Sequence, residues 1–215
     1  MSEAMNKVVL DANHFDSKAR QWDENPVFRD RANKIAAAIQ AAIPLNKSMR
    51  ALDYGSGSGL LSFPLQGQLG HITLKDTSPG MLAVAAEKVA ALGVTNMTTK
   101  LMDLTLAALP DERYDLIYSS MTLHHVPDTN AILATFLALL NPGGWLCIAD
   151  LDKEDGSFHG MQVDVHHGFE RTTLAAQASQ AGFGEIDFST VFEIVKETET
   201  GQRAYPVFLM LARRI

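Results

Sequence analysis

The chain has 215 residues, enough for one domain with a substantial core, and its 47% hydrophobic and 20% charged content is ordinary for a globular protein. A formal net charge of −7 argues against a nucleic-acid partner, which favours a basic face. No apolar run reaches the roughly 18 residues that cross a bilayer, and the first residues lack the basic-then-apolar order of a signal peptide. We therefore expect a cytoplasmic protein without a membrane partner.

The first predicted elements are two helices. Residues 14–24 place Phe15, Ala19 and Trp22 on one side of a short amphipathic helix. A second helix begins at Pro26 and ends before Pro44. We expect residues 1–46 to form a helical segment ahead of a single domain that covers residues 47–215.

Short apolar runs then alternate with helical patterns. Strands are predicted at 49–54, 71–75, 97–102, 114–120 and 144–150, and helices at 60–69, 79–92 and 129–140. Such alternation predicts βαβ units and a parallel sheet covered on both faces. The lone cysteine, Cys147, lies in the apolar run WLCIA and is expected to be a buried, unreactive thiol.

The end of the chain follows a different pattern. A helix is predicted at 171–181 and ends at Gly182, and the strand-like runs 185–197 and 204–214 read as an antiparallel hairpin at the sheet edge. Residues 151–169 form an irregular, histidine-rich insertion, and loops of this length in a compact domain are usually functional.

The glycine-rich stretch 53–59, DYGSGSG, joins the first strand to a helix. It has no lysine after it and so is no P-loop, and its spacing is G-x-G-x-G rather than the G-x-G-x-x-G of dinucleotide sites. Glycine lets backbone approach a ligand closely, so the loop alone fits either a nicotinamide dinucleotide or another nucleotide cofactor.

Three acidic residues narrow the choice of cofactor. Asp53 ends the first strand, where its carboxylate can meet a cationic amine. Asp76 ends the second strand and can accept hydrogen bonds from both hydroxyls of a ribose. Asp103 follows the third strand, placed to reach an adenine amino group.

Together with SSMTLHHV at 119–126 and NPGG at 141–144, these motifs resemble the class I S-adenosylmethionine-dependent methyltransferases of the type 11/12-like, small-molecule branch, over residues 48–152. The resemblance implies an α/β, Rossmann-like three-layer sandwich with a seven-stranded, mostly parallel sheet whose last strand is antiparallel. It also implies S-adenosylmethionine as the cofactor. The implied cofactor-binding residues are Asp53, Tyr54, Gly55, Gly57, Gly59, Asp76, Thr77, Met81, Asp103, Leu104 and Ser119.

Motifs that the chain lacks restrict the possible identity of the methyl acceptor. Residues 119–122, SSMT, contain neither the proline-rich motif of enzymes that methylate amino groups of bases nor the acidic ligands of metal-dependent catechol-type enzymes. One cysteine cannot supply arsenic-type chemistry. A small-molecule acceptor methylated at oxygen or carbon is favoured, and nitrogen stays open.

Histidines are the candidates for acid–base work, because an imidazole takes a proton near neutral pH. We assign this role to His124, His125 and His167, and expect His167→Ala to spare cofactor binding and reduce turnover; the alternative is that these histidines only cap and pack. No metal site is assigned, although a zinc site of His159, His166 and one of His124 and His125 is conceivable. The amino-terminal helix resembles a lid over the cofactor, and the candidate substrate-binding residues are Phe15, Arg20, Trp22, His166 and Arg171.

Two rival functions stay open beside the methyltransferase: a nicotinamide-dependent reductase on a similar fold, and a non-catalytic module that senses S-adenosylmethionine. S-adenosylhomocysteine is expected to raise the melting temperature, whereas NADH is not. The oligomeric state is left undetermined by the sequence.

Overall fold

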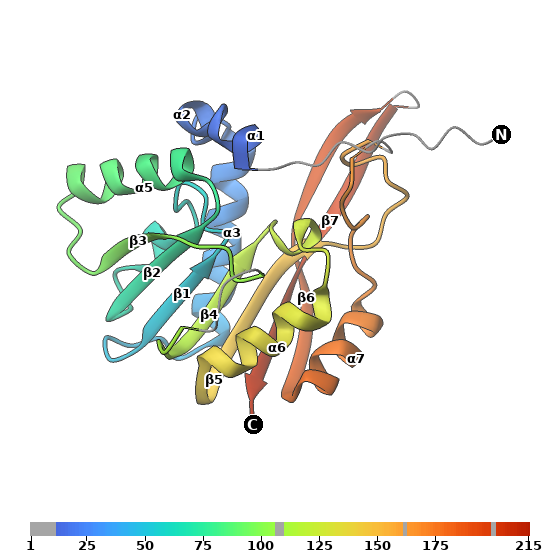
Figure 1. Cartoon of the computed structure of the whole chain (residues 1–215). Helices are drawn as coiled ribbons and strands as arrows, with labels where there is room; N and C mark the ends of the chain where they lie inside the picture. The colour runs from blue at the N-terminus through green and yellow to red at the C-terminus, as the bar shows by residue number, and fades with distance from the viewer. Residues whose placement is uncertain (1–11, 106–109, 161–162, 199–200) are drawn as a thin grey trace.

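A single sheet organises the molecule (Figure 1). The computed structural model describes residues 12–105, 110–160, 163–198 and 201–215, and within these ranges the sheet has seven strands in the order β3-β2-β1-β4-β5-β7-β6. The strands are β1 (Arg50–Tyr54), β2 (His71–Asp76), β3 (Met97–Leu101), β4 (Tyr114–Ser120), β5 (Leu140–Leu151), β6 (Phe183–Thr198) and β7 (Gly201–Arg214).

The strand directions confirm the predicted fold. Strands β1 to β5 pair in parallel, whereas β7 runs antiparallel to both β5 and β6. Strand β1 lies between β2 and β4, so the chain turns to opposite sides of β1 in its two halves. In open α/β sheets, the crevice at such a switch point, at the carboxyl ends of the strands, is where ligands bind.

Helices cover both faces of the sheet (Figure 1). Helices α3 (Pro26–Ala42), α4 (Ser62–Leu65) and α5 (Pro79–Ala91) pack on one face, and α6 (Thr129–Leu139) and α7 (Arg171–Ala181) on the other. Alternate residues of β1 serve the two layers: Ala51 belongs to the cluster with Ile39 of α3, and Leu52 to the cluster with Phe136 of α6. Among the helices of the described ranges, none is both long and apolar enough to cross a bilayer.

The amino-terminal helix differs from its prediction. In place of one helix over 14–24, the chain forms α1 (Ala12–Asp16) and α2 (Ala19–Trp22), which both contact α5. The break lies at Ser17, whose hydroxyl donates to the carbonyl of His14 at 2.9 Å and so competes with the helical backbone pattern. The predicted helix 60–69 is likewise shortened, to α4. Cys147 is fully buried in β5, as predicted, and burial raises the pKa of its thiol.

Candidate active site

A cavity of about 500 Å³ lies at the carboxyl ends of β1, β2 and β4, at the switch point of the sheet. Its wall comes from the glycine loop after β1, the start of α5, the loop after β4 and the amino-terminal helices. The predicted site residues found in this wall are Phe15, Trp22, Asp53, Tyr54, Gly55, Gly57, Asp76, Thr77, Met81, Asp103 and His125. The structure therefore brings together most of the residues assigned to the cofactor.

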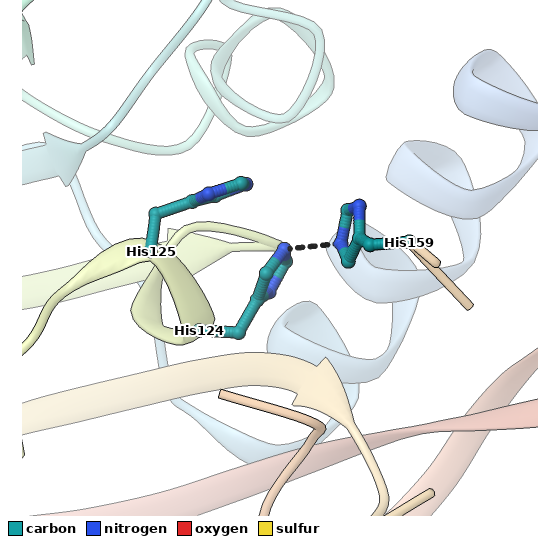
Figure 2. Close-up of side chains that lie close together, drawn as sticks. All are labelled: His124, His125 and His159. Atoms are coloured by element: carbon teal, nitrogen blue, oxygen red, sulfur yellow. Dashed lines mark hydrogen bonds between the residues drawn. The ribbon is translucent and has the colours of Figure 1, made fainter. Parts of the chain in front are cut away.

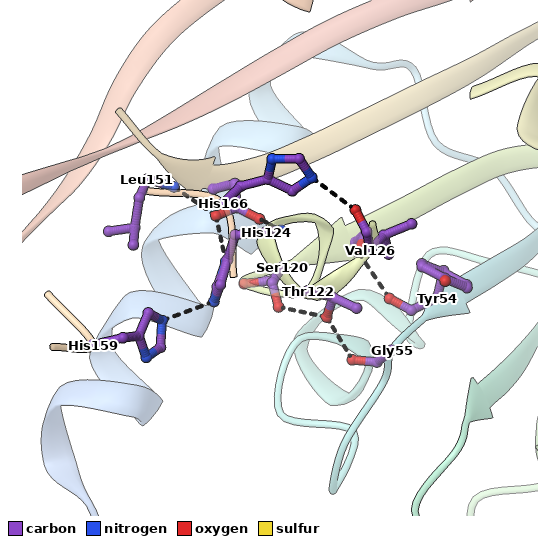
Figure 3. Close-up of polar contacts among 11 residues, drawn as sticks. Tyr54, Gly55, Ser120, Thr122, His124, Val126, Leu151, His159 and His166 are labelled. Carbon is purple, nitrogen blue, oxygen red and sulfur yellow. Dashed lines mark hydrogen bonds and ion pairs between the residues drawn. The ribbon is translucent and has the colours of Figure 1, made fainter. Parts of the chain in front are cut away.

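The glycine loop needs its glycines for two reasons. Gly55, Gly57 and Gly59 have φ angles of +66°, +53° and +82°, a region that L side chains rarely adopt. At Gly55 there is also no room, because a Cβ atom there would lie 2.2 Å from Cγ2 of Thr122. Thr122 holds the loop from the other side, since its hydroxyl donates to the carbonyl of Gly55 at 3.2 Å (Figure 3).

Asp76 ties the glycine loop to the next helix. Its Oδ2 accepts a hydrogen bond from the amide of Gly57 at 2.7 Å, and its Oδ1 accepts one from the amide of Ser78 at 2.8 Å. Ser78 in turn caps α5, because its hydroxyl accepts from the amide of Met81. A carboxylate at the tip of β2 is thus held between two backbone segments and faces the cavity.

Asp53 is a carboxylate with little to balance its charge. It is buried at the end of β1, and its Oδ2 accepts a hydrogen bond from the hydroxyl of Ser62 at 2.6 Å. Burial, with a contribution from the nearby charge of Asp76, raises the pKa of Asp53 to about 7. A buried acid of this kind favours a cationic ligand, which would replace the lost hydration of its charged form.

Arg31, which was not among the predicted residues, is a buried cation in the same wall. Its side chain is 8% exposed, its guanidinium lies 5.1 Å from the ring centre of Phe28, and its Nε has no hydrogen-bond partner among the residues that the structure describes. Burial lowers its pKa to about 10. The signal was present in the sequence, because Arg31, Ile35 and Ile39 share one helical face at four-residue spacing.

Of the remaining predicted cofactor residues, Asp103 lies in the wall, and Leu104, Ser119 and Gly59 lie outside it. Asp103 is in the wall, and its Oδ1 accepts hydrogen bonds from the amide and hydroxyl of Thr105 in a local turn. Leu104 is buried in the core beside it. Ser119 donates to the carbonyl of Tyr54 at 2.8 Å, and its neighbour Ser120 reaches the wall instead. Gly59 also lies outside the wall.

The predicted substrate-binding residues separate into two groups. Phe15 and Trp22 face the cavity with ring centres 6.1 Å apart. Arg20 forms an exposed ion pair with Glu87, and Arg171 a bidentate pair with Asp152, with both distances 2.7 Å. His166 donates from Nε2 to the carbonyl of Val126 at 2.9 Å and lies outside the cavity wall (Figure 3).

Two of the predicted catalytic histidines, His124 and His125, lie close to His159 of the insertion. His124 and His125 lie in the 3₁₀ turn η1 (Leu123–His125), and Nε2 of His124 lies 3.0 Å from Nε2 of His159 (Figure 2). The zinc set considered from the sequence joined His159 to His166 and to one of His124 and His125. The structure instead brings both His124 and His125 to His159 and leaves His166 outside the group. His167, the remaining catalytic candidate, lies outside both this group and the cavity wall.

The rings of His125 and His159 are poor proton acceptors. Burial, together with the neighbouring imidazoles, lowers the pKa of His125 to about 3 and that of His159 to about 4. Both rings are therefore neutral at pH 7. A general base works best with a pKa near the working pH, so this environment suits neutral, electron-donating roles better than proton abstraction.

Comparison with known proteins points to one family. Residues 27–186 match the model of a methyltransferase domain family. The chain is 30% identical over 141 residues to a ubiquinone biosynthesis O-methyltransferase of Paraburkholderia phytofirmans, covering 65% of this chain and 61% of the relative. It is 30% identical over 171 residues to a ubiquinone/menaquinone biosynthesis C-methyltransferase, UbiE, of Shewanella halifaxensis, covering 76% and 68%.

The fold has solved counterparts as well. A crystal structure of a SAM-dependent methyltransferase from Aquifex aeolicus superposes with a TM-score of 0.69 at 20% identity, covering 93% of this chain and 98% of the other. The shared fold, the matched family model and the glycine loop with its acidic partners lead to one conclusion: the chain belongs to the class I S-adenosylmethionine-dependent methyltransferases.

Proposed function

We propose that the protein transfers a methyl group from S-adenosylmethionine to a small-molecule acceptor, at an oxygen or a carbon atom. The observation that carries the proposal is the cavity at the switch point, in which Asp53, Asp76 and the glycine loop converge. Two relatives, an O-methyltransferase and a C-methyltransferase, support the choice of acceptor atom. The match covers 61% of the length of the O-methyltransferase, which is less than two thirds.

Each part of the cofactor has a complementary group in the cavity wall. We assign Asp53 to the ammonium group and Arg31 to the carboxylate, because they are a buried acid and a buried base in the wall, and Nε of Arg31 has no hydrogen-bond partner among the described residues. Asp76 is assigned to the ribose hydroxyls and Asp103 to the adenine. Gly57 leaves room for the methionine chain, since a Cβ there would find only Sδ of Met81 within 4 Å, whereas Thr122 fills the corresponding space at Gly55.

The residues that remain in the wall serve the acceptor. Bound S-adenosylmethionine supplies an electrophilic methyl group, and the transfer requires the acceptor to be aligned and water to be excluded. Phe15, Trp22 and Phe28 supply an apolar, aromatic wall on the side of the amino-terminal helices. This wall favours an acceptor with a flat or apolar body.

We propose further that α1 and α2 are the lid within residues 1–46. Asp16 of α1 accepts a hydrogen bond from the amide of Gly80 at 2.8 Å, and Asp23, just after α2, contacts both Ser58 and Lys88. Polar contacts of this kind can break and re-form as the cavity opens. Helix α3 is different, because it buries Ile35 and Ile39 in the core and so stays with the domain.

The proposal is tested by binding first and by transfer second. S-adenosylhomocysteine should raise the melting temperature and NADH should not; the reverse result would favour the reductase. Formation of S-adenosylhomocysteine is then measured with phenols, quinols, carboxylic acids and amines as acceptors. Binding without turnover on any of these classes would favour the non-catalytic sensor.

We also propose that the protein acts in the cytoplasm and not on nucleic acid. The support is the net charge of −7, which disfavours a phosphate backbone, and the single buried cysteine.

A further inference from the structure

Three histidine side chains form a compact group beside the cavity. His124 and His125 come from the turn after β4, and His159 comes from the insertion after β5 (Figure 2). One ring nitrogen from each lies within 4.8 Å of those of the other two. We call this group the histidine cluster. His125 also belongs to the cavity wall, so the cluster adjoins the cavity.

The spacing of the nitrogens suits a metal ion. Zinc binds imidazole nitrogen at about 2.0–2.1 Å, which places two tetrahedral ligands roughly 3.4 Å apart. The Nε2 atoms of His124 and His159 are 3.0 Å apart, so a movement of a few tenths of an ångström would admit an ion between them. His125 is near enough to supply a third bond, since its ring centre lies 4.2 Å from that of His124 and 5.6 Å from that of His159.

Asp150 orients the central ligand. Its Oδ1 lies 2.7 Å from Nδ1 of His124, and its Oδ2 accepts a hydrogen bond from the amide of the same residue at 3.2 Å. Both side chains are almost completely buried. A carboxylate at Nδ1 keeps the proton on that nitrogen and presents the lone pair of Nε2, the arrangement common behind metal-bound histidines.

The balance of charge around the cluster is compatible with a cation. Lys196 is a positive charge near His159, but its ammonium donates to the carbonyl of Phe158 at 2.7 Å and lies 3.7 Å from the centre of that ring. The buried carboxylate of Asp150 supplies a negative charge, which also attracts the buried guanidinium of Arg31.

From this geometry we infer that His124, His125 and His159 bind a zinc ion, with Asp150 as the residue that positions His124. Three imidazoles select a borderline transition metal over Mg²⁺ or Ca²⁺, which prefer oxygen ligands. Three protein ligands leave a fourth tetrahedral position for a water or a ligand oxygen, as in catalytic zinc sites.

One consequence depends on the proposed function. Zinc lowers the pKa of an oxygen bound to it, so an acceptor hydroxyl in the open position would lose its proton at neutral pH without a basic side chain. Metal binding itself does not depend on methyl transfer, and the two can therefore be tested separately.

The test uses the full chain without a polyhistidine tag, freed of metal by a chelator. Zinc binding is measured by isothermal titration calorimetry, and Co²⁺ is added as a spectroscopic substitute. We expect one zinc ion per chain, a rise in melting temperature and the strong visible absorption of four-coordinate Co²⁺. His159→Gln should weaken zinc binding by more than the 10- to 100-fold that loss of an outer-shell partner costs, and Asp150→Asn by about that amount.

Two matched variants serve as controls. His71→Gln alters a histidine at the start of β2, where the ring contacts Thr98, and should leave zinc binding unchanged. His166→Gln should also leave it unchanged, which distinguishes the cluster from a set that includes His166. No zinc binding in the wild type, or equal binding in wild type and His159→Gln, would overturn the inference. The effect of S-adenosylhomocysteine on the melting temperature of the zinc-free protein reports on the proposed function independently.

Discussion

The amide of Gly57 donates a hydrogen bond to Oδ2 of Asp76 across 2.7 Å, so the carboxylate assigned to the ribose also holds the glycine loop in place. Asp76→Ala removes both interactions. Hydrogen bonds that involve a charged group contribute about 1.5–3 kcal/mol each, so we expect the affinity for S-adenosylhomocysteine to fall at least 10-fold. Isothermal titration calorimetry measures this directly.

Asp187→Ala is the matched control for Asp76→Ala. Asp187 is exposed on β6, outside the cavity wall, and its loss should leave the affinity unchanged. Unchanged affinity in Asp76→Ala would refute the assignment to the ribose.

The raised pKa of Asp53 makes stability depend on pH. Its pKa is about 7 in the native protein and ordinarily 3.8, so between these values the unfolded chain is ionised at this position and the native chain holds the proton. Unfolding then releases a proton, and the free energy of unfolding falls as the pH rises from about 4 to about 7, by about 1.4 kcal/mol for each unit of pKa difference. We expect Asp53→Asn to remove this contribution, so that its urea midpoint falls less than that of the wild type between pH 5 and pH 8.

The same carboxyl couples proton release to cofactor binding. The ammonium group of the cofactor favours the ionised form of Asp53, so binding should expel a proton below pH 7. We therefore expect the affinity for S-adenosylhomocysteine to increase from pH 5 to pH 8. Calorimetry in buffers of different ionisation enthalpy counts the protons released, and an equal count in wild type and Asp53→Asn would contradict the assignment.

Gly55 and Gly57 should respond differently to alanine. A Cβ at Gly55 meets Thr122 at 2.2 Å, whereas one at Gly57 finds only Sδ of Met81 at 3.9 Å. Both substitutions incur the roughly 1–2 kcal/mol of a left-handed backbone, and Gly55→Ala adds a steric clash. We expect Gly55→Ala to be the more destabilising in urea unfolding, and Gly57→Ala to lose cofactor affinity because its new methyl group enters the cavity.

The double variant Gly55→Ala with Thr122→Gly checks the steric explanation. Removal of the Thr122 side chain should restore part of the stability that Gly55→Ala loses. If Gly57→Ala proved as destabilising as Gly55→Ala, backbone strain alone would account for both.

Most of the fold and half of the site followed from local sequence. Asp53, Asp76 and the glycine loop could be placed together because the carboxyl ends of parallel strands share one edge of the sheet. The strands could be found because buried parallel strands are short apolar runs. Leu104 and Ser119 show the limit of this reasoning, since a motif gives a position in the chain but not whether a side chain faces the cavity or the core.

Only part of the histidine cluster could be assembled from the sequence, which joined His159 to one of His124 and His125 but added His166. His124 and His159 are 35 positions apart, and the segment that carries His159 has no periodicity from which its path could be derived. Its position depends on contacts such as the 2.7 Å hydrogen bond between the hydroxyls of Ser157 and Tyr205. Such contacts arise from the tertiary structure and leave no local pattern.

Arg31 should distinguish ligands by whether they carry an amino-acid group. Its guanidinium is buried in the cavity wall without a hydrogen-bond partner for Nε among the described residues, and we assign it to the cofactor carboxylate. Arg31→Met should therefore weaken S-adenosylhomocysteine binding roughly 10- to 100-fold, from the 1.5–3 kcal/mol of a charged hydrogen bond. Methylthioadenosine lacks both the carboxylate and the ammonium group, so its affinity should be unchanged.

Lys34→Met provides the control, because Lys34 is exposed on the same helix and the substitution changes the net charge equally. The ligand-free Arg31→Met protein should be no less stable than the wild type, since the burial that lowers the pKa of Arg31 outweighs its attraction to Asp150, and an apolar side chain of similar length replaces the buried charge. A loss of affinity that was equal for S-adenosylhomocysteine and methylthioadenosine would indicate a general change in the cavity. Unchanged affinity for both would move Arg31 from the cofactor to the acceptor, whose anionic group it would then bind.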